Sequence, residues 1–278
     1  MRGAMRFTDA IVIRIPPNVD YGDRKVKGKD KPDLVLARQQ QEDFNDILRE
    51  SGLNVTELAP EDTTSVHSLC IDNAAVVING TALLTKPKHE NPRLAEISAA
   101  LKGLAWQVVD QNEADYSKNA VLEGSDVLFT GREIFVGLRK NGTNMEGASV
   151  LGKVFGDFPV IPLKIDGQHP LKSLVSLALD GVLAFSKEKE SQHVLKRMQS
   201  ECTYNYEVIT LDSEEAVNCL NINDHLIFRQ DTPEPKFQSI KQPTQLWGVN
   251  ASELNKIAGL LSQHVLLIKK LKGVKNIL

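Results

Sequence analysis

Cysteine is scarce in this sequence, and its scarcity excludes the small cross-linked proteins that rely on disulfides. The chain of 278 residues contains three cysteines, Cys70, Cys202 and Cys219, and none lies in a Cys-x-x-Cys pair. Three thiols cannot form a disulfide framework, and chains of this kind are typical of a reducing compartment. The sequence therefore predicts a cytoplasmic protein with a core large enough to need no covalent cross-links.

Long apolar runs and a strong excess of one charge are also missing. The apolar run within residues 1–17 is too short for a signal peptide or a membrane span. The formal net charge is -3, which argues against a protein that binds nucleic acid through phosphate contacts. We expect neither a membrane nor a nucleic acid as partner, and the oligomeric state stays open.

Apolar residues at helical spacing recur along the whole chain. Each segment places apolar residues three or four positions apart, or a multiple of that, so that one helical face is buried. Successive segments begin about 55 residues apart, which is the signature of an internal repeat. The segments contain Leu34/Ala37/Phe44/Leu48, Leu94/Ile97/Leu101/Leu104, Ala148/Leu151/Val154/Phe155, Val194/Leu195/Met198 and Leu254/Ile257/Leu261.

Predicted β-hairpins follow the same period. Two-residue turns at Asn79-Gly80, Gly131-Arg132, Asp180-Gly181 and Asn223-Asp224 separate short apolar strands. Residues of these types tolerate the positive φ that tight hairpin turns require. Each hairpin is followed by a helix, or a short equivalent, and then by one more short strand.

The repeating unit is therefore strand, strand, helix, strand, and the fifth copy is split between the two ends of the chain. We predict an α/β fold in which five units form a closed, pseudo-symmetric propeller. The strand at 265–268 would pair with the strand at 10–15 and close the ring, which makes residues 1–278 a single domain. An open mixed α/β sheet is the alternative.

A radial repeat brings equivalent positions together at its axis, so the segments just before the hairpins are the candidate site. They are residues 70–73, 122–126, 166–173 and 261–264. Two carboxylates, a carboxamide and two histidines would meet there from distant parts of the chain. Taken singly, an aspartate before a strand is usually a cap, and a lone histidine is usually a hydrogen-bonded core residue.

One of these segments carries a specific resemblance. LEGSDVLFTGREIFVGL resembles the (D/E)GGDVLFTGREFFVGL segment of the dimethylarginine dimethylaminohydrolase family, within the guanidine-modifying pentein superfamily. The resemblance covers nearly the whole chain, and its other segments occur in the same order. They are FTDAIVIRIP, PDLVLARQQQEDF, NAAVVINGTALLTKP, LKSLVSL, VNCLNIN and GLLSQHVLLIKK. It implies a five-bladed α/β propeller, a place in arginine metabolism and nitric oxide regulation, and no cofactor or metal.

The family chemistry implied by this resemblance needs a cysteine thiolate that attacks a guanidinium carbon and a histidine that acts on the leaving amine. Gln263 occupies the nucleophile position, and an amide cannot form a thiolate. His169 is the candidate for the histidine. An extra residue in Gly167–Ser173 also allows Pro170 to align there.

The resemblance also assigns residues to substrate binding, and several depart from the family pattern. Glu123 and Asp126 keep the family's acidic character, whereas a Glu-Asp pair becomes Asp72-Asn73 and an aspartate becomes His67. One of the arginines that grip the substrate α-carboxylate aligns with Pro92, next to Arg93. The substrate-binding candidates are Asp72, Asn73, Glu123, Asp126, Arg93, His67 and His264.

Two alternatives remain for the missing chemistry. Cys70 lies two residues before Asp72 and is an alternative nucleophile, although a neighbouring carboxylate raises a thiol pKa. His67, His169 and His264 would suit zinc if they met, but no ligand spacing supports a metal site.

We therefore expect a catalytically degenerate homologue with a binding or regulatory role, whose partner would be a small guanidino or amino-acid ligand in the central channel. The first alternative is an active hydrolase with a rearranged site, which releases citrulline and an amine. The second is a structural or storage protein.

Overall fold

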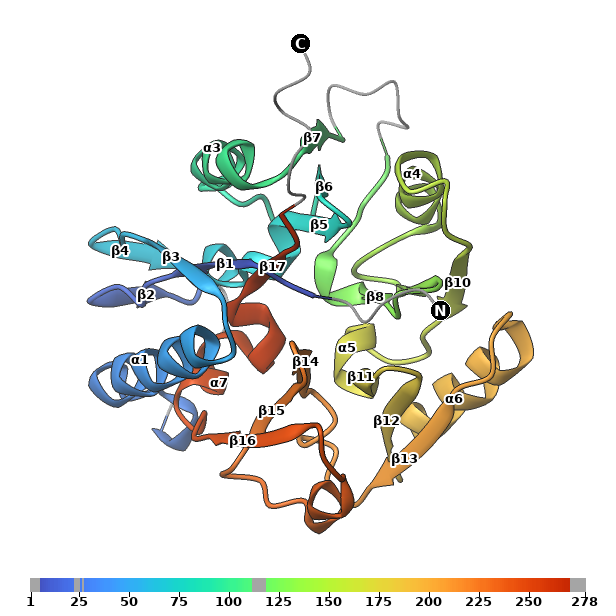
Figure 1. Cartoon of the computed structure of the whole chain (residues 1–278). Helices are drawn as coiled ribbons and strands as arrows, with labels where there is room; N and C mark the ends of the chain where they lie inside the picture. Colours follow the sequence, from blue (N-terminus) through green and yellow to red (C-terminus); the bar gives the residue numbers. More distant parts are fainter. Residues whose placement is uncertain (1–5, 23–25, 27, 112–118, 271–278) are drawn as a thin grey trace.

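The computed structural model describes residues 6–22, 26, 28–111 and 119–270. Within these ranges, five three-stranded sheets surround a common centre (Figure 1). In each sheet two strands pair antiparallel and the third pairs parallel to the second. The pentein propeller built from strand-strand-helix-strand units is confirmed.

The strands follow one order in every blade. The first strand lies nearest the centre, the second pairs with it, and the third forms the outer edge (Figure 1). Blade by blade the strands are β17 (Leu266–Ile268), β1 (Asp9–Ile13) and β3 (Asn54–Leu58); β5 (Ala75–Ile78), β6 (Thr81–Leu84) and β7 (Gln107–Asp110); β8 (Val127–Phe129), β9 (Ile134–Leu138) and β10 (Val160–Lys164); β11 (Val175–Leu179), β12 (Val182–Ser186) and β13 (Glu207–Leu211); and β14 (Leu220–Ile222), β15 (His225–Arg229) and β16 (Gln245–Val249).

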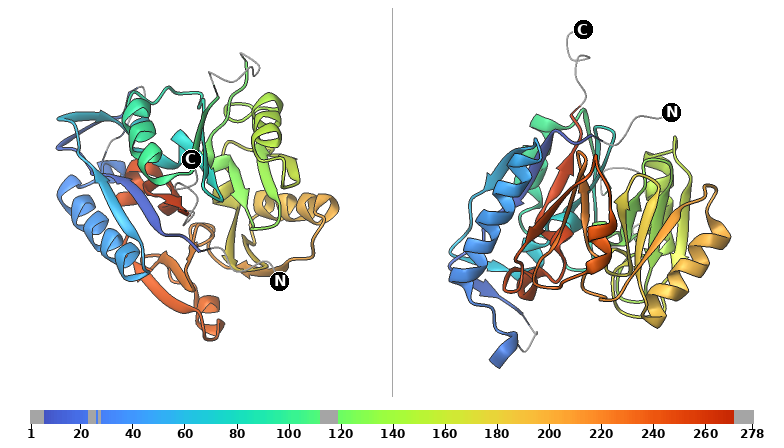
Figure 2. Two further views of the ribbon diagram at one scale, coloured as in Figure 1. Left: turned by 45° about the horizontal axis from the view of Figure 1, so that its top comes forward. Right: turned by 60° about the horizontal axis from the view of Figure 1, so that its bottom comes forward.

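Amphipathic helices cover the outside of the ring. They are α1 (Leu34–Glu50), α3 (Leu94–Leu104), α4 (Met145–Val154) and α6 (Lys189–Glu201). Figure 2 shows α1 and α6 on opposite outer sides of the molecule. Asp33 caps the N-terminus of α1, and its carboxylate accepts hydrogen bonds from two main-chain N–H groups of the first turn. Its buried face includes Ala37, Phe44 and Leu48, as the apolar spacing predicts.

The two ends of the chain close the ring, as predicted. Strand β17 pairs antiparallel with β1, with Asp9 opposite Ile268. The Thr8 N–H also donates to the Ile268 carbonyl at 2.9 Å. Four blades are built on a hairpin and the fifth on the pair of terminal strands, so the fifth blade is equivalent to the other four.

Two of the four hairpin turns have both central residues at positive φ, as their residues predict. Asn79 and Gly80 have φ values of 47° and 84°, and Asn223 and Asp224 have values of 49° and 67°. Two consecutive residues at positive φ define the turn that matches the twist of the paired strands. In the other two turns only Gly131 and Gly181 have positive φ, and Gly131-Arg132 lies in a four-residue loop, because Phe129 pairs with Ile134.

In the blade of β14, β15 and β16 the helix position holds the short equivalent that the repeat allows, the 3-10 helix η4 (Pro235–Ser239). Other elements differ from the sequence predictions. The helix predicted from Leu254, Ile257 and Leu261 is limited to α7 (Leu254–Ala258), because Gly259 adopts φ 84° and ends it. The two-stranded sheet of β2 (Asn18–Asp20) and β4 (Thr63–Ser65) and the short helix α2 (Val66–Leu69) were not predicted.

Single helical turns precede four of the inner strands and bring the candidate site together. They are η2 (Ile71–Ala74), η3 (Gly124–Asp126), α5 (Leu171–Leu174) and η5 (Leu261–His264). Turn η2 contacts η3 and η5, and α5 contacts η3. A Cβ on Gly124 would lie 1.7 Å from the Asp72 carbonyl oxygen, so this approach of η3 to η2 requires glycine.

None of the helices in the described ranges combines the length and the apolar character that a membrane crossing requires.

Candidate functional site

A buried group of three charges stands at the centre of the site. The Arg139 Nε donates to both oxygens of Asp126, at 2.7 and 2.9 Å, and its Nη2 donates to a carboxylate oxygen of Glu123. The side chains of Arg139, Glu123 and Asp126 are 9%, 10% and 0% exposed. Charge-assisted bonds of this kind are the strongest hydrogen bonds in proteins, so the guanidinium is held firmly between two carboxylates.

Local structure fixes both carboxylates and the arginine. Asp126 ends η3 and accepts a hydrogen bond from the Thr143 hydroxyl at 2.9 Å and from the Leu171 N–H at 3.2 Å. Arg139 directly follows β9, two residues after Gly137, so the two residues share a face of the chain. A Cβ on Gly137 would lie 3.5 Å from an Asp126 oxygen and 2.9 Å from the Leu171 Cβ.

Arg139 carries its charge permanently in this environment. Burial opposes the charged form, but the hydrogen bonds and the negative charges of Asp126 and Glu123 outweigh it and raise the pKa of Arg139 further. The two carboxylates that the family resemblance assigns to a cationic substrate are thus already paired with a guanidinium of the chain itself.

Gln263 is buried in η5 and is bonded back to its own turn. Its Oε1 accepts a hydrogen bond from the Leu260 N–H at 3.2 Å, while its main-chain N–H donates to the Leu260 carbonyl at 3.1 Å. The side chain is 8% exposed and completes the start of the turn. An amide in this arrangement is a local cap and has no nucleophilic chemistry.

A second pair of charges lies beside this group. Asp72 is 3% exposed, and neither of its carboxylate oxygens has a hydrogen-bond partner. The Lys172 Nζ lies 3.6 Å from its Oδ2, which is an ion-pair distance but too long for a hydrogen bond. Burial raises the pKa of Asp72 to about 6, against the opposing effect of Lys172.

Asn218 and Ser262 complete the polar residues beside Lys172. The Asn218 amide donates to the Ser262 hydroxyl at 3.0 Å and to the Lys172 carbonyl at 2.9 Å, and it accepts from the Ser262 N–H at 2.9 Å. These bonds satisfy the Asn218 side chain and tie η5 to the residues before β14.

The histidine and the thiol next to the centre are both buried. Burial lowers the pKa of His264 to about 4, so its imidazole is neutral near pH 7, and its Nε2 has no hydrogen-bond partner. Cys70 is 8% exposed, and its thiol contacts the Val66 carbonyl at 3.6 Å.

The two remaining histidines among the sequence candidates are both exposed. His169 is exposed, and it is the Gln168 carbonyl that accepts a hydrogen bond from Arg139, at 3.2 Å. His67 is exposed and stacks on His89, with ring centroids 4.1 Å apart.

Arg93 and Asn73 have structural partners instead. The buried Arg93 side chain donates to Glu96 at 2.6 Å and to the Ala59 carbonyl at 2.6 Å. The Asn73 amide oxygen accepts from the Ser125 N–H at 2.9 Å and so joins η2 to η3. Among the described residues, no group of three or more histidine, cysteine or acidic side chains has an arrangement suited to a metal ion.

The sequence analysis missed Arg139 and the pairing of Lys172 with Asp72. Arg139 directly follows LEGSDVLFTGREIFVGL, the segment that carries the resemblance, so that segment gives no guide to it. The one local signal is its place two residues after Gly137, on the face where the missing Cβ leaves room beside Asp126.

Sequence comparison finds similar proteins along nearly the whole chain, although no family model matches the chain. It is 29% identical to DDAH2 of Homo sapiens and 28% identical to DDAH2 of Bos taurus, in each case over 96% of both chains.

Solved structures of the same fold include a DDAH variant from Pseudomonas aeruginosa complexed with citrulline. The likeness has a TM-score of 0.75 at 18% identity, over 95% of this chain and 100% of that one. The N-terminal domain of ArgZ, a cyanobacterial arginine dihydrolase bound to its product, matches with a TM-score of 0.72 at 16% identity, over 94% and 98% of the two chains. Over nearly its whole length this chain is therefore similar to DDAH2, and it has the pentein fold of DDAH and ArgZ.

Proposed function

We propose that this protein does not hydrolyse guanidino compounds and serves as a cytoplasmic binding or regulatory protein of arginine and nitric oxide metabolism. The observation that carries the proposal is the guanidinium of Arg139 between Glu123 and Asp126. A substrate guanidinium would have to displace a covalently tethered one from two buried carboxylates. Gln263 supports the same conclusion, because it offers no thiolate for attack.

The first test is an assay of citrulline release from dimethylarginine and arginine. We expect no release above the uncatalysed rate from the wild-type chain, and none from Gln263→Cys, because Arg139 still fills the carboxylate pair. Turnover at a rate typical of enzymes would overturn the proposal. Its loss in Cys70→Ala would identify Cys70 as the nucleophile of the rearranged hydrolase.

The second test asks whether Arg139 occupies a guanidinium site. Arg139→Ala leaves two buried carboxylates without their cation, which typically costs about 3–5 kcal/mol of stability. Methylguanidine at millimolar concentration should raise the melting temperature of this variant and leave that of the wild type unchanged.

Arg197→Ala is the matched control for this rescue. Arg197 pairs with Asp166 at 2.8 Å, but both side chains are partly exposed, and water replaces the lost cation. We expect a small loss of stability and no effect of methylguanidine. Equal rescue of both variants, or methylguanidine binding to the wild type, would contradict the proposed self-occupied site.

A further inference from the structure

The axis of the propeller contains a cavity that Glu123, Asp126 and Arg139 do not line. It has a volume of about 180 Å³, is partly open to solvent, and is lined by residues from the inner strand of every blade. The walls are mainly apolar and include Ile78 of β5, Phe129 of β8, Leu177 of β11, Leu220 of β14 and Leu266 of β17. We call this cavity the axial channel.

One end of the axial channel is polar, and its polar groups are incompletely bonded. Asp72 and Lys172 line it there, and the two carboxylate oxygens of Asp72 lack hydrogen-bond partners although the residue is only 3% exposed. The nearby Asn218 is fully used by Lys172 and Ser262. Asp72 therefore offers a carboxylate that accepts hydrogen bonds, and Lys172 offers an ammonium group that donates them.

The spacing of this pair selects the chemistry of a ligand. Asp72 Oδ2 and Lys172 Nζ are 3.6 Å apart, so neither fully satisfies the other. The ammonium group of Lys172 would repel a cationic ligand, and the carboxylate of Asp72 would repel an anionic one. A neutral primary carboxamide avoids both repulsions, because its NH₂ group donates to the carboxylate while its carbonyl oxygen accepts from the ammonium group.

The apolar walls define the rest of the ligand. An engineered apolar cavity of about 150 Å³ in another protein binds benzene, so the axial channel has room for a group of that size. We propose that the axial channel binds a neutral primary carboxamide with a compact apolar substituent, the carboxamide bridging Asp72 and Lys172. The proposal does not rest on the loss of hydrolysis, because Gln263 and Arg139 do not line the channel.

Benzamide is the probe, titrated into the full-length protein by isothermal calorimetry at pH 7.5. We expect saturable binding at one site per chain. Benzoate and benzylamine test the two charges, and toluene tests the apolar walls alone. Each should bind about tenfold more weakly or worse, because each lacks at least one of the two hydrogen bonds.

Two variants locate the binding. Lys172→Met removes the donor and should weaken benzamide binding at least about tenfold while leaving toluene unaffected. Leu220→Trp places an indole in the axial channel and should abolish binding. Val208→Trp is its control, because Val208 is 37% exposed on the outer strand β13 and does not line the channel. Near-ultraviolet circular dichroism checks that each variant is folded.

Several outcomes would overturn the proposal. They are the absence of saturable benzamide binding, affinity for toluene equal to that for benzamide, and unchanged binding in folded Leu220→Trp and Lys172→Met. Turnover of dimethylarginine would contradict the proposed function and leave this inference intact, so the two fail separately.

Discussion

Two buried residues of the central turns, Asp72 and His264, respond to pH in opposite directions. Burial raises the pKa of Asp72 from 3.8 to about 6, so the folded chain holds a proton there that the unfolded chain has released. The contribution of Asp72 to stability is therefore favourable at low pH and is lost as the pH rises through about 6. Burial lowers the pKa of His264 from 6.5 to about 4, and its contribution is lost as the pH falls through that range.

Asp72→Asn isolates the first of these effects. The stability of this variant relative to the wild type should increase by about 2.5 kcal/mol between pH 4 and pH 7, since one pKa unit corresponds to about 1.4 kcal/mol and the unfolded carboxyl is already partly ionised at pH 4. Urea denaturation at half-unit pH steps measures the difference.

His264→Asn is the complementary variant. Its stability relative to the wild type should increase as the pH falls from 6.5 to 4, the reverse of the trend for Asp72→Asn. A difference independent of pH for either variant would show that the folded protein does not shift that pKa.

Some residues of the site could be predicted from the sequence, and some could not. Glu123 and Asp126 are recognisable because they sit in the specific segment before a predicted hairpin. Arg139 is not, because it lies just beyond that segment and its ion pairs depend on distances across the fold. Whether Gln263 and His169 have the roles that the resemblance suggests stays a prediction.

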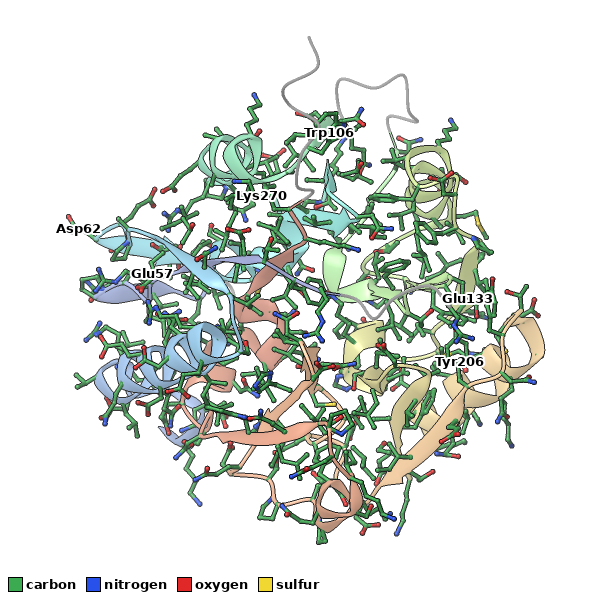
Figure 3. The ribbon with its side chains drawn as sticks, in the orientation of Figure 1. Glu57, Asp62, Trp106, Glu133, Tyr206 and Lys270 are labelled. Carbon is green, nitrogen blue, oxygen red and sulfur yellow. The ribbon has the colours of Figure 1, made fainter. Side chains whose placement is uncertain are left out.

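At the scale of elements, a buried glutamate joins two neighbouring blades. Glu133 is fully buried before β9 and accepts hydrogen bonds from the Tyr206 hydroxyl at 2.9 Å and the Thr203 hydroxyl at 2.6 Å, on the segment between α6 and β13. Figure 3 shows Glu133 and Tyr206 close together on that side of the ring. Burial, together with the bond to Glu133, raises the pKa of Tyr206 well above its usual range.

Tyr206→Phe should therefore weaken the contact between these blades. It removes one hydrogen bond to a buried charge, and we expect a loss of about 1.5–3 kcal/mol in the free energy of unfolding. Tyr204→Phe is the matched control, because Tyr204 is 38% exposed and its ring contact with Arg132 survives the change. Equal effects of the two substitutions in urea denaturation would show that the Glu133 contact does not stabilise the interface.

The repeated strands and hairpins could be predicted from the sequence more readily than the irregular segments between the blades. Asn79-Gly80 and Asn223-Asp224 predict their hairpins because the turn is a local property of the backbone. The strands β2 and β4 have three residues each, which is too short for a periodicity to indicate them. The end of α7 at Gly259 shows how one residue at positive φ limits a helix that apolar spacing alone would extend.

At the scale of the whole molecule, the ring depends on the pairing of its first and last strands. The apolar core is distributed over four clusters of buried residues among the described ones, and the cluster that contains β1 also contains β17. Val265, Leu266 and Ile268 are each at most 5% exposed. Burial of an aliphatic side chain contributes about 1.5–3 kcal/mol, so these three together contribute a sum comparable to the total stability of a typical domain.

Truncation after Leu260 should therefore unfold the protein, whereas moving the chain ends should not. Removal of η5 and β17 leaves β1 without its antiparallel partner and opens the axial channel along one side.

In a circular permutant, a flexible linker joins the natural ends and the new ends lie at the Asp180-Gly181 turn, so every strand pair is retained. If residues 1–278 form one domain, the permutant should show a single cooperative urea transition and near-ultraviolet circular dichroism like the wild type, and the truncated chain should show neither. Cooperative folding of the truncated chain would mean that the other four blades are stable without closure, and the single-domain prediction would then be wrong.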